Sequence, residues 1–170
     1  MVFGHREIAA ERDIPASATT MFAFLSDLEN HWLLASRFIE VLRLEGPEGA
    51  RHGGEVRMRG PLGVSRRAAT RVVEADEPRA MRGVAELGRG TTARVSWALA
   101  PRAGGTSVRL AAHVESAGTV DRLLLAAGGR GWLRRRFAGT LDRLAELAPS
   151  MSARSENAAP PTHGATAGRR

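Results

Sequence analysis

The distribution of apolar residues predicts a long amphipathic helix in the segment Thr119–Ala148. From Leu133 onward the apolar residues follow one another at spacings of four, four, three and four, which places them on one stripe of an α-helix. The stripe consists of Leu133, Phe137, Leu141, Leu144 and Ala148. The opposite face is charged and carries Arg134, Arg135, Arg136, Asp142, Arg143 and Glu146. No other predicted helix is as long, so this one has to cover the rest of the structure.

Between about residue 38 and residue 116 the pattern is that of consecutive β-strands. Six segments are separated by turns rich in Gly and Pro. They are Phe38–Glu45, Gly54–Arg59, Val64–Ala75, Arg79–Leu87, Thr92–Ala100 and Thr106–Glu115. In the last two, apolar residues such as Trp97 and Leu110 alternate with polar ones such as Arg94 and Arg109. This alternation predicts an antiparallel sheet with one face toward the helix and one toward water.

Three further elements precede these strands. His5–Asp13 alternates like a strand, and a short helix with Met21, Phe22 and Leu25 on one face follows Pro15. Asp27–Ala35 is predicted to be a second short helix. The predicted fold class is α+β, with a curved antiparallel sheet of about seven strands in the order β-α-α-β6-α, wrapped on a long C-terminal helix.

The length of 170 residues suits one domain, which we place at residues 1–148. From Pro149 to Arg170 the chain is rich in Ser, Ala, Pro, Gly, Thr and Arg, so residues 149–170 are predicted to be a disordered tail. The sequence contains no apolar run long enough for a membrane span, no apolar signal-peptide core and no Cys. We therefore expect a cytoplasmic protein without disulfides. The sequence carries no signal for an oligomeric state.

The chain contains neither Lys nor Tyr, so its positive charge comes from Arg. That composition excludes Schiff-base lysines, P-loop lysines and tyrosine acids. The formal net charge is +7, which is compatible with an anionic partner. Basic residues are nevertheless scattered along the chain among acidic ones, so we do not expect nucleic acid as a partner.

Several stretches resemble a known superfamily. They are IPASATTMFAFLSDLENHW, VVEADEP, GGTSVRLAAHVE and FAGTLDRLAEL. Over about residues 5–148 the chain resembles the START-like (SRPBCC) superfamily, in its bacterial polyketide cyclase/dehydrase and lipid-transport branch. The resemblance implies the helix-grip fold and a deep cavity between the curved sheet and the long helix.

Inward-facing apolar positions are the candidates for binding a ligand in such a cavity. They are Leu25, Trp32, Met58, Met81, Trp97, Leu110, Phe137 and Leu141. The alternative for each of them is ordinary core packing.

Two residues are candidates for chemistry. His31 stands beside Trp32, where it could hydrogen bond a ligand or act as an acid or base, or could simply be exposed. Arg66 alternates with Val64 and Ala68, so it faces either the cavity, where it could bind a carboxylate or phenolate, or solvent. No cluster has metal-ligand spacing, and we expect neither a metal nor a cofactor.

The run Gly128–Phe137, GGRGWLRRRF, lacks the spacing of a nucleotide-binding loop. It predicts a break between a first helical piece at Val120–Ala127 and the main helix, which could gate ligand entry. Trp132 and Leu133 beside several Arg residues also allow transient contact with an anionic membrane.

Three functions are consistent with these features. The first is binding or transport of a hydrophobic small molecule, such as a lipid, a polyketide or an isoprenoid-like compound. The second is an enzyme of the polyketide aromatase/cyclase or dehydrase type, in which His31 or Arg66 would act within the same cavity. The third is a module that docks on a partner or a membrane.

Overall fold

The computed structural model describes residues 7–60 and 63–158 of the chain. Strand β1 (Glu7–Ile14) is followed by the short helices α1 (Ala18–Leu25) and α2 (Leu28–Leu34). The six strands after them are β2 (Ile39–Glu45), β3 (Gly53–Arg59), β4 (Ser65–Asp76), β5 (Ala80–Glu86), β6 (Thr92–Arg102) and β7 (Gly105–Ser116). The last helical elements are α3 (Thr119–Leu124), a wide helical turn at Leu125–Gly129 and the long helix α4 (Arg130–Ala158).

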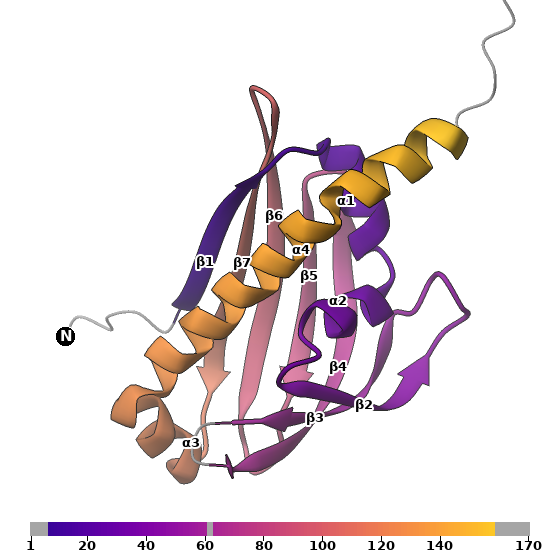
Figure 1. The fold of residues 1–170 in the computed structure, drawn as a ribbon. Helices are drawn as coiled ribbons and strands as arrows, with labels where there is room; N and C mark the ends of the chain where they lie inside the picture. The colour runs from indigo at the N-terminus through magenta and orange to yellow at the C-terminus, as the bar shows by residue number, and fades with distance from the viewer. Residues whose placement is uncertain (1–6, 61–62, 159–170) are drawn as a thin grey trace, which may run out of the picture.

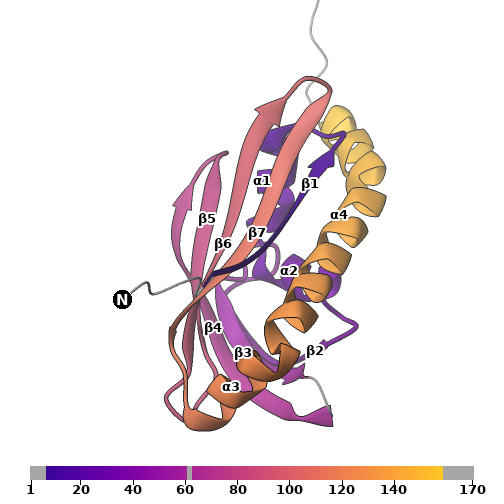
Figure 2. The same ribbon diagram turned by 90° about the vertical axis from the view of Figure 1, so that its left-hand side faces the viewer.

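All seven strands form one open antiparallel sheet in the order β1-β7-β6-β5-β4-β3-β2. Strands β2 to β7 pair in chain order, and β1 adds to the outer edge of β7. Helices α1 and α2 carry the chain from β1 at one edge to β2 at the other (Figure 1). The sheet curves around α4 (Figure 2), and this helix crosses the inner face diagonally (Figure 1).

Side-chain caps set the start of each short helix. The Ser17 hydroxyl accepts a hydrogen bond from the Thr20 backbone N–H at 3.1 Å and begins α1. The Asp27 carboxylate accepts from the Glu29 N–H at 3.0 Å and begins α2. Asp27 also accepts from the Arg51 N–H at 3.3 Å, so the same side chain ties α2 to the loop before β3.

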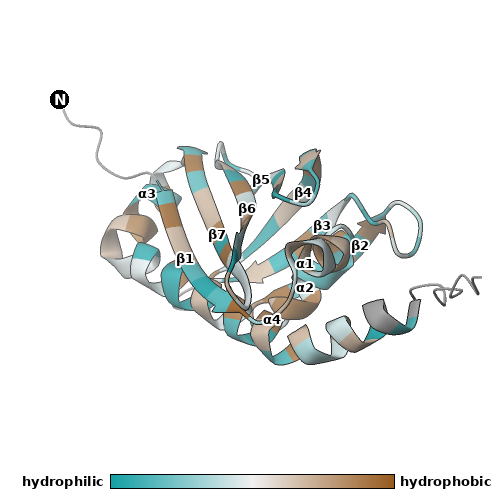
Figure 3. Ribbon diagram, turned by 90° about the horizontal axis from the view of Figure 1, so that it is seen from above, coloured by the Kyte–Doolittle hydropathy of each residue, from teal (hydrophilic) through white to brown (hydrophobic). Residues whose placement is uncertain are grey.

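The main core lies under the C-terminal half of α4. Leu141, Leu144 and Ala148 have no exposed surface and pack in one cluster with Ile14 and Met21. The strands alternate between apolar and polar residues along their length (Figure 3), and their apolar residues face this helix. A smaller cluster of Leu28, Trp32, Val56 and Ala68 fills the space under α2.

These observations confirm the predicted α+β helix-grip architecture, including the number of strands and their order. The predicted bounds of strands β2 to β7 and of helix α2 agree with the observed ones to within about two residues. No helix among the described residues is long and apolar enough to cross a membrane.

The predicted end of the long helix is wrong. Helix α4 continues through Pro149 to Ala158, so residues 149–158 are helical rather than disordered. The reason is Met151, which is only 7% exposed and extends the apolar stripe by one more step of three. Pro149 is exposed, and the burial of Met151 helps offset the helical hydrogen bond that proline cannot donate. Residues 159–170, the rest of the predicted tail, lie outside the described part.

Candidate functional site

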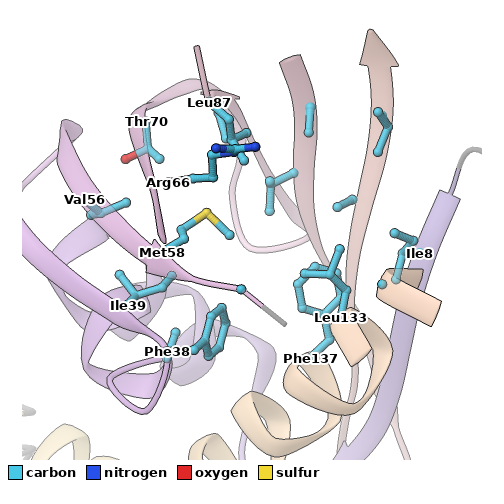
Figure 4. A pocket seen from close by; sticks show the side chains of 18 of the residues that line it. Ile8, Phe38, Ile39, Val56, Met58, Arg66, Thr70, Leu87, Leu133 and Phe137 are labelled. Carbon is cyan, nitrogen blue, oxygen red and sulfur yellow. The ribbon is translucent and has the colours of Figure 1, made fainter. Parts of the chain in front are cut away.

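A cavity of about 270 Å³ lies between the sheet and the N-terminal part of α4. Residues from all seven strands line one side of the cavity, and residues of α2, α3 and α4 line the opposite side and the ends. Figure 4 shows how Met58, Phe38 and Ile39 approach it from one side, and Leu133 and Phe137 from helix α4 on the other. The lining is almost entirely apolar, so the cavity offers an environment suited to a hydrophobic molecule.

Small side chains on the strands create this space. Ala85 of β5 lies opposite Ala93 of β6, and Ala112 of β7 lies opposite Val95. All four line the cavity. A methyl group reaches much less far from the sheet than a Leu or Met side chain, so this part of the inner face stands away from α4. The cavity is therefore encoded by residue size at inward positions rather than by a gap between elements.

Large side chains close the cavity toward the main core. Trp97 of β6 is 4% exposed and lies between Met81 of β5 and Leu110 of β7 in the sheet register. Trp97 and Leu110 face the cavity, whereas Met81 is packed into the core beyond it.

A sharp break between α3 and α4 closes the other end. Ala127 has φ −82° and ψ 28°, and Gly128 has φ 100°, a left-handed conformation that favours glycine. A side chain at Gly129 would stand 2.5 Å from the carbonyl oxygen of Leu124, so this position also requires glycine. The predicted break is confirmed. It folds α3 back so that Leu124 and Leu125 line the cavity.

An aromatic contact joins the start of α4 to the segment before β2. The rings of Phe38 and Trp132 meet edge to face, with centroids 5.9 Å apart. The Arg136 guanidinium carbon lies 5.1 Å from the Trp132 ring centroid and 5.8 Å from that of Phe38. Cation–π contacts of this kind contribute about 0.5–1 kcal/mol each at partly exposed sites. This cluster holds α4 against the side of the cavity near β2.

His31 lines the cavity from helix α2, so the prediction that it could be fully exposed is wrong. Its Nε2 lies 2.6 Å from the Leu25 carbonyl oxygen, which can only accept, so Nε2 carries the proton and donates. The His31 ring packs edge to face against the Trp97 ring, with the ring centroids 5.3 Å apart. Loss of hydration on burial lowers the pKa of His31 to about 4, outweighing the hydrogen bond to Leu25 and the charge of Asp27. His31 is therefore neutral at pH 7.

Arg66 also lines the cavity, so the solvent-facing alternative is wrong for this residue. Its Nε donates to the Asp121 carboxylate of α3 at 3.4 Å, with side-chain exposures of 20% and 14%. The second Asp121 oxygen accepts from the Thr91 hydroxyl. Thr91 in turn accepts from the Gly118 N–H at 2.9 Å. These bonds tie α3 to β4 and to the turn between β5 and β6.

The predicted ligand-binding residues divide into two groups. Those that line the cavity are Trp32, Met58, Trp97, Leu110 and Phe137. Those outside the lining are Leu25, Met81 and Leu141, which are nearly or fully buried in the main core. Periodicity identifies the inward face but not where along it α4 touches the sheet. Contact of either group with a ligand stays a prediction.

Some lining residues were missed. Val56 shares its strand face with Met58, and Leu125 lies within the predicted helical piece Val120–Ala127, so alternation and helical spacing could have identified both. Phe38 and Ile39 lie where α2 joins β2, and nothing in the periodicity distinguishes them. Over residues 7–60 and 63–158, no three His, Cys, Asp or Glu side chains come together in a way that could hold a metal ion.

The fold recurs in proteins of known structure. The TTHA0849 protein from Thermus thermophilus is 23% identical and superposes with a TM-score of 0.65, covering 86% of this chain and 99% of its own. The KanY protein is 18% identical with a TM-score of 0.66, covering 84% and 97%. A START superfamily protein from Mycobacterium smegmatis is 16% identical with a TM-score of 0.55, covering 88% and 98%. At these identities the likeness concerns the fold.

Among curated proteins, none matches the chain. A protein-family model described as polyketide cyclase / dehydrase and lipid transport matches residues 5–149. That match spans the sheet, both short helices, the cavity and α4 as far as Pro149, and so the chain belongs to this family of START-like, helix-grip proteins.

Proposed function

We propose that the protein binds a hydrophobic small molecule of the lipid, polyketide or isoprenoid type in this cavity and carries it. The observation that supports the proposal is the unfilled apolar space under α4. Protein interiors are normally close-packed, and an unfilled cavity lowers stability. A cavity lined by Ala85, Ala93 and Ala112, where larger apolar residues would fill it, is explained by the presence of an occupant.

The size of the cavity bounds the ligand. At about 270 Å³ it lies at the small end of the range of roughly 300–1,000 Å³ typical of ligand pockets. A single acyl chain or a few fused rings matches this volume, whereas a lipid with two long chains would have to leave part of itself outside.

The state of His31 argues for binding rather than acid–base catalysis. A general acid or base works best when its pKa lies near the working pH. The pKa of His31 is about 4, and its one ring proton is donated to the Leu25 carbonyl. At neutral pH the ring has no second proton to give and is a weak base. The role that remains for it is to accept a hydrogen bond at Nδ1.

Filling the cavity from the sheet tests the proposal. In Ala93→Leu, a larger apolar side chain enters the cavity from β6. In the control Ala98→Leu, the same change is made on the exposed outer face of the same strand. Binding is measured as the fluorescence of N-phenyl-1-naphthylamine, an uncharged probe, titrated into the full chain, with native mass spectrometry for molecules that copurify.

We expect saturable probe binding by the wild type, a loss of at least about tenfold in affinity for Ala93→Leu, and wild-type affinity for Ala98→Leu. Such a loss corresponds to about 1.4 kcal/mol. The filled variant should stay folded, because added apolar atoms occupy space that is already empty. Equal affinities in the two variants would show that the probe does not bind in this cavity and would contradict the proposal.

A further inference from the structure

Among the cavity-lining residues that the structure describes, full charges meet only at the Arg66–Asp121 pair. Among the described residues of the lining, the ionisable ones are His31, Arg66 and Asp121. His31 is neutral at pH 7, and the other two form an ion pair of opposite charge. The described part of the cavity wall therefore carries no net charge at pH 7.

Asp121 is held so that it stays beside Arg66. Each of its carboxylate oxygens accepts a hydrogen bond, one from Arg66 Nε and the other from the Thr91 hydroxyl. Thr91 is itself fixed by the Gly118 N–H. Two donors on different elements thus orient this carboxylate toward Arg66.

The outer part of the Arg66 guanidinium keeps its hydrogen-bond donors. The bond to Asp121 uses Nε, and within residues 7–60 and 63–158 no acceptor bonds to Nη1 or Nη2. In Figure 4 this guanidinium is seen above Met58, in the same part of the view as Leu87. Both of these residues are apolar and line the cavity. The Arg66 guanidinium thus offers N–H donors in an apolar wall, and the Asp121 carboxylate neutralises its positive charge.

We propose that the cavity selects an uncharged amphiphile whose carbonyl or ether oxygen accepts hydrogen bonds from Arg66, and that Asp121 excludes carboxylate ligands by cancelling the charge of Arg66. An anion that leaves water for an apolar cavity needs a compensating positive charge. Asp121 already neutralises the positive charge of Arg66, so none is left to compensate a bound anion. A neutral acceptor needs only the donors, and these remain available. The inference rests on the proposed function and narrows its ligand class.

The test compares two probes with the same chain length, dodecan-2-one and dodecanoate, at pH 8. Affinities are measured by displacement of N-phenyl-1-naphthylamine from the full chain. For the wild type we expect dodecan-2-one to bind at least about tenfold more tightly than dodecanoate, equivalent to about 1.4 kcal/mol.

Two variants separate the roles of the pair. Asp121→Asn keeps the size of the side chain and an acceptor for Thr91 but leaves the Arg66 charge uncancelled. The affinity for dodecanoate should then rise at least about tenfold, whereas the affinity for dodecan-2-one should stay within about threefold of the wild-type value. Arg66→Met combined with Asp121→Asn restores a neutral wall without the donor. There dodecanoate should bind no better than to the wild type, and dodecan-2-one should weaken by about threefold to tenfold.

Two results would overturn the inference, and a third would overturn the proposed function on which it rests. Wild-type protein that binds dodecanoate as tightly as dodecan-2-one would overturn it without any variant, so a variant that fails to fold does not prevent a decision. A dodecanoate to dodecan-2-one ratio unchanged by Asp121→Asn would overturn the role of Asp121. Binding of neither probe, nor of N-phenyl-1-naphthylamine, would instead overturn the proposed function itself.

Discussion

Mild acid should destabilise this protein through His31. In an unfolded chain a His titrates near pH 6.5, whereas in the folded protein burial lowers the pKa of His31 to about 4. Between these two values the unfolded chain binds one more proton than the folded one. The free energy of unfolding therefore falls as the pH falls through this window, with a slope of up to about 1.4 kcal/mol per pH unit.

Between pH 7 and pH 5 the expected loss is about 2 kcal/mol, because most of the change lies below pH 6.5. This is a large fraction of the roughly 5–15 kcal/mol that stabilises a typical domain. Urea unfolding followed by circular dichroism at pH 7, 6 and 5 measures the loss. Stopping at pH 5 keeps most carboxylates ionised, since Asp and Glu titrate near pH 4.

His31→Gln isolates the effect, because Gln can still donate to the Leu25 carbonyl but does not titrate. Its stability should change by less than about 0.5 kcal/mol over the same range. His113→Gln is the matched control, since His113 is exposed on β7, and it should keep the wild-type dependence. If His31→Gln loses stability in parallel with the wild type, His31 is not held neutral by burial, and the argument against acid–base catalysis at this residue fails with it.

Three further outcomes are expected. Gly128→Ala should lower the free energy of unfolding by about 1–2 kcal/mol, because Gly128 has φ 100°. Gly139→Ala, in the exposed middle of α4, should raise it by at most about 1 kcal/mol, and urea unfolding measures both changes. Leu144→Ala, at a position without exposed surface, should cost about 2–5 kcal/mol in the same assay. Full-length protein should float with anionic but not with neutral liposomes at low salt. Replacing the exposed Arg134 and Arg135 by Glu should abolish flotation with anionic liposomes. Wild-type protein that stays at the bottom of the gradient would contradict the membrane prediction.

Much of the fold could be predicted because its determinants are local. Turns rich in Gly and Pro separate the strands, and alternation assigns each strand its inner face. The break before α4 was predictable as well, since consecutive glycines interrupt a helical pattern, and in the structure Gly128 adopts a left-handed conformation there. The end of α4 was not, because a Pro normally marks the end of a helix, and here the tertiary contact made by Met151 outweighs that preference.

The polar residues of the cavity could be predicted only in part. Alternation left two orientations open for Arg66, and the structure resolves them through Asp121, which lies 55 positions away in the sequence. Neither residue predicts the other, because the pairing depends on how α3 folds back after β7. The state of His31 could not be predicted either, because its neutral form results from burial beside Trp97 and other apolar groups that come from distant strands.

The cavity itself depends on residue size, a property that a binary pattern of apolar and polar positions ignores. Met81 and Ala85 lie on the same strand, and both are buried and apolar. Met81 belongs to the main core and Ala85 lines the cavity, although periodicity treats the two alike. The same contrast separates Leu99 of the main core from the cavity-lining Ala93 on β6. Along β5 and β6 the inner face thus changes from large to small side chains at the point where α4 leaves the main core, and a sequence reading that weighs side-chain volume at inward positions would place the cavity there.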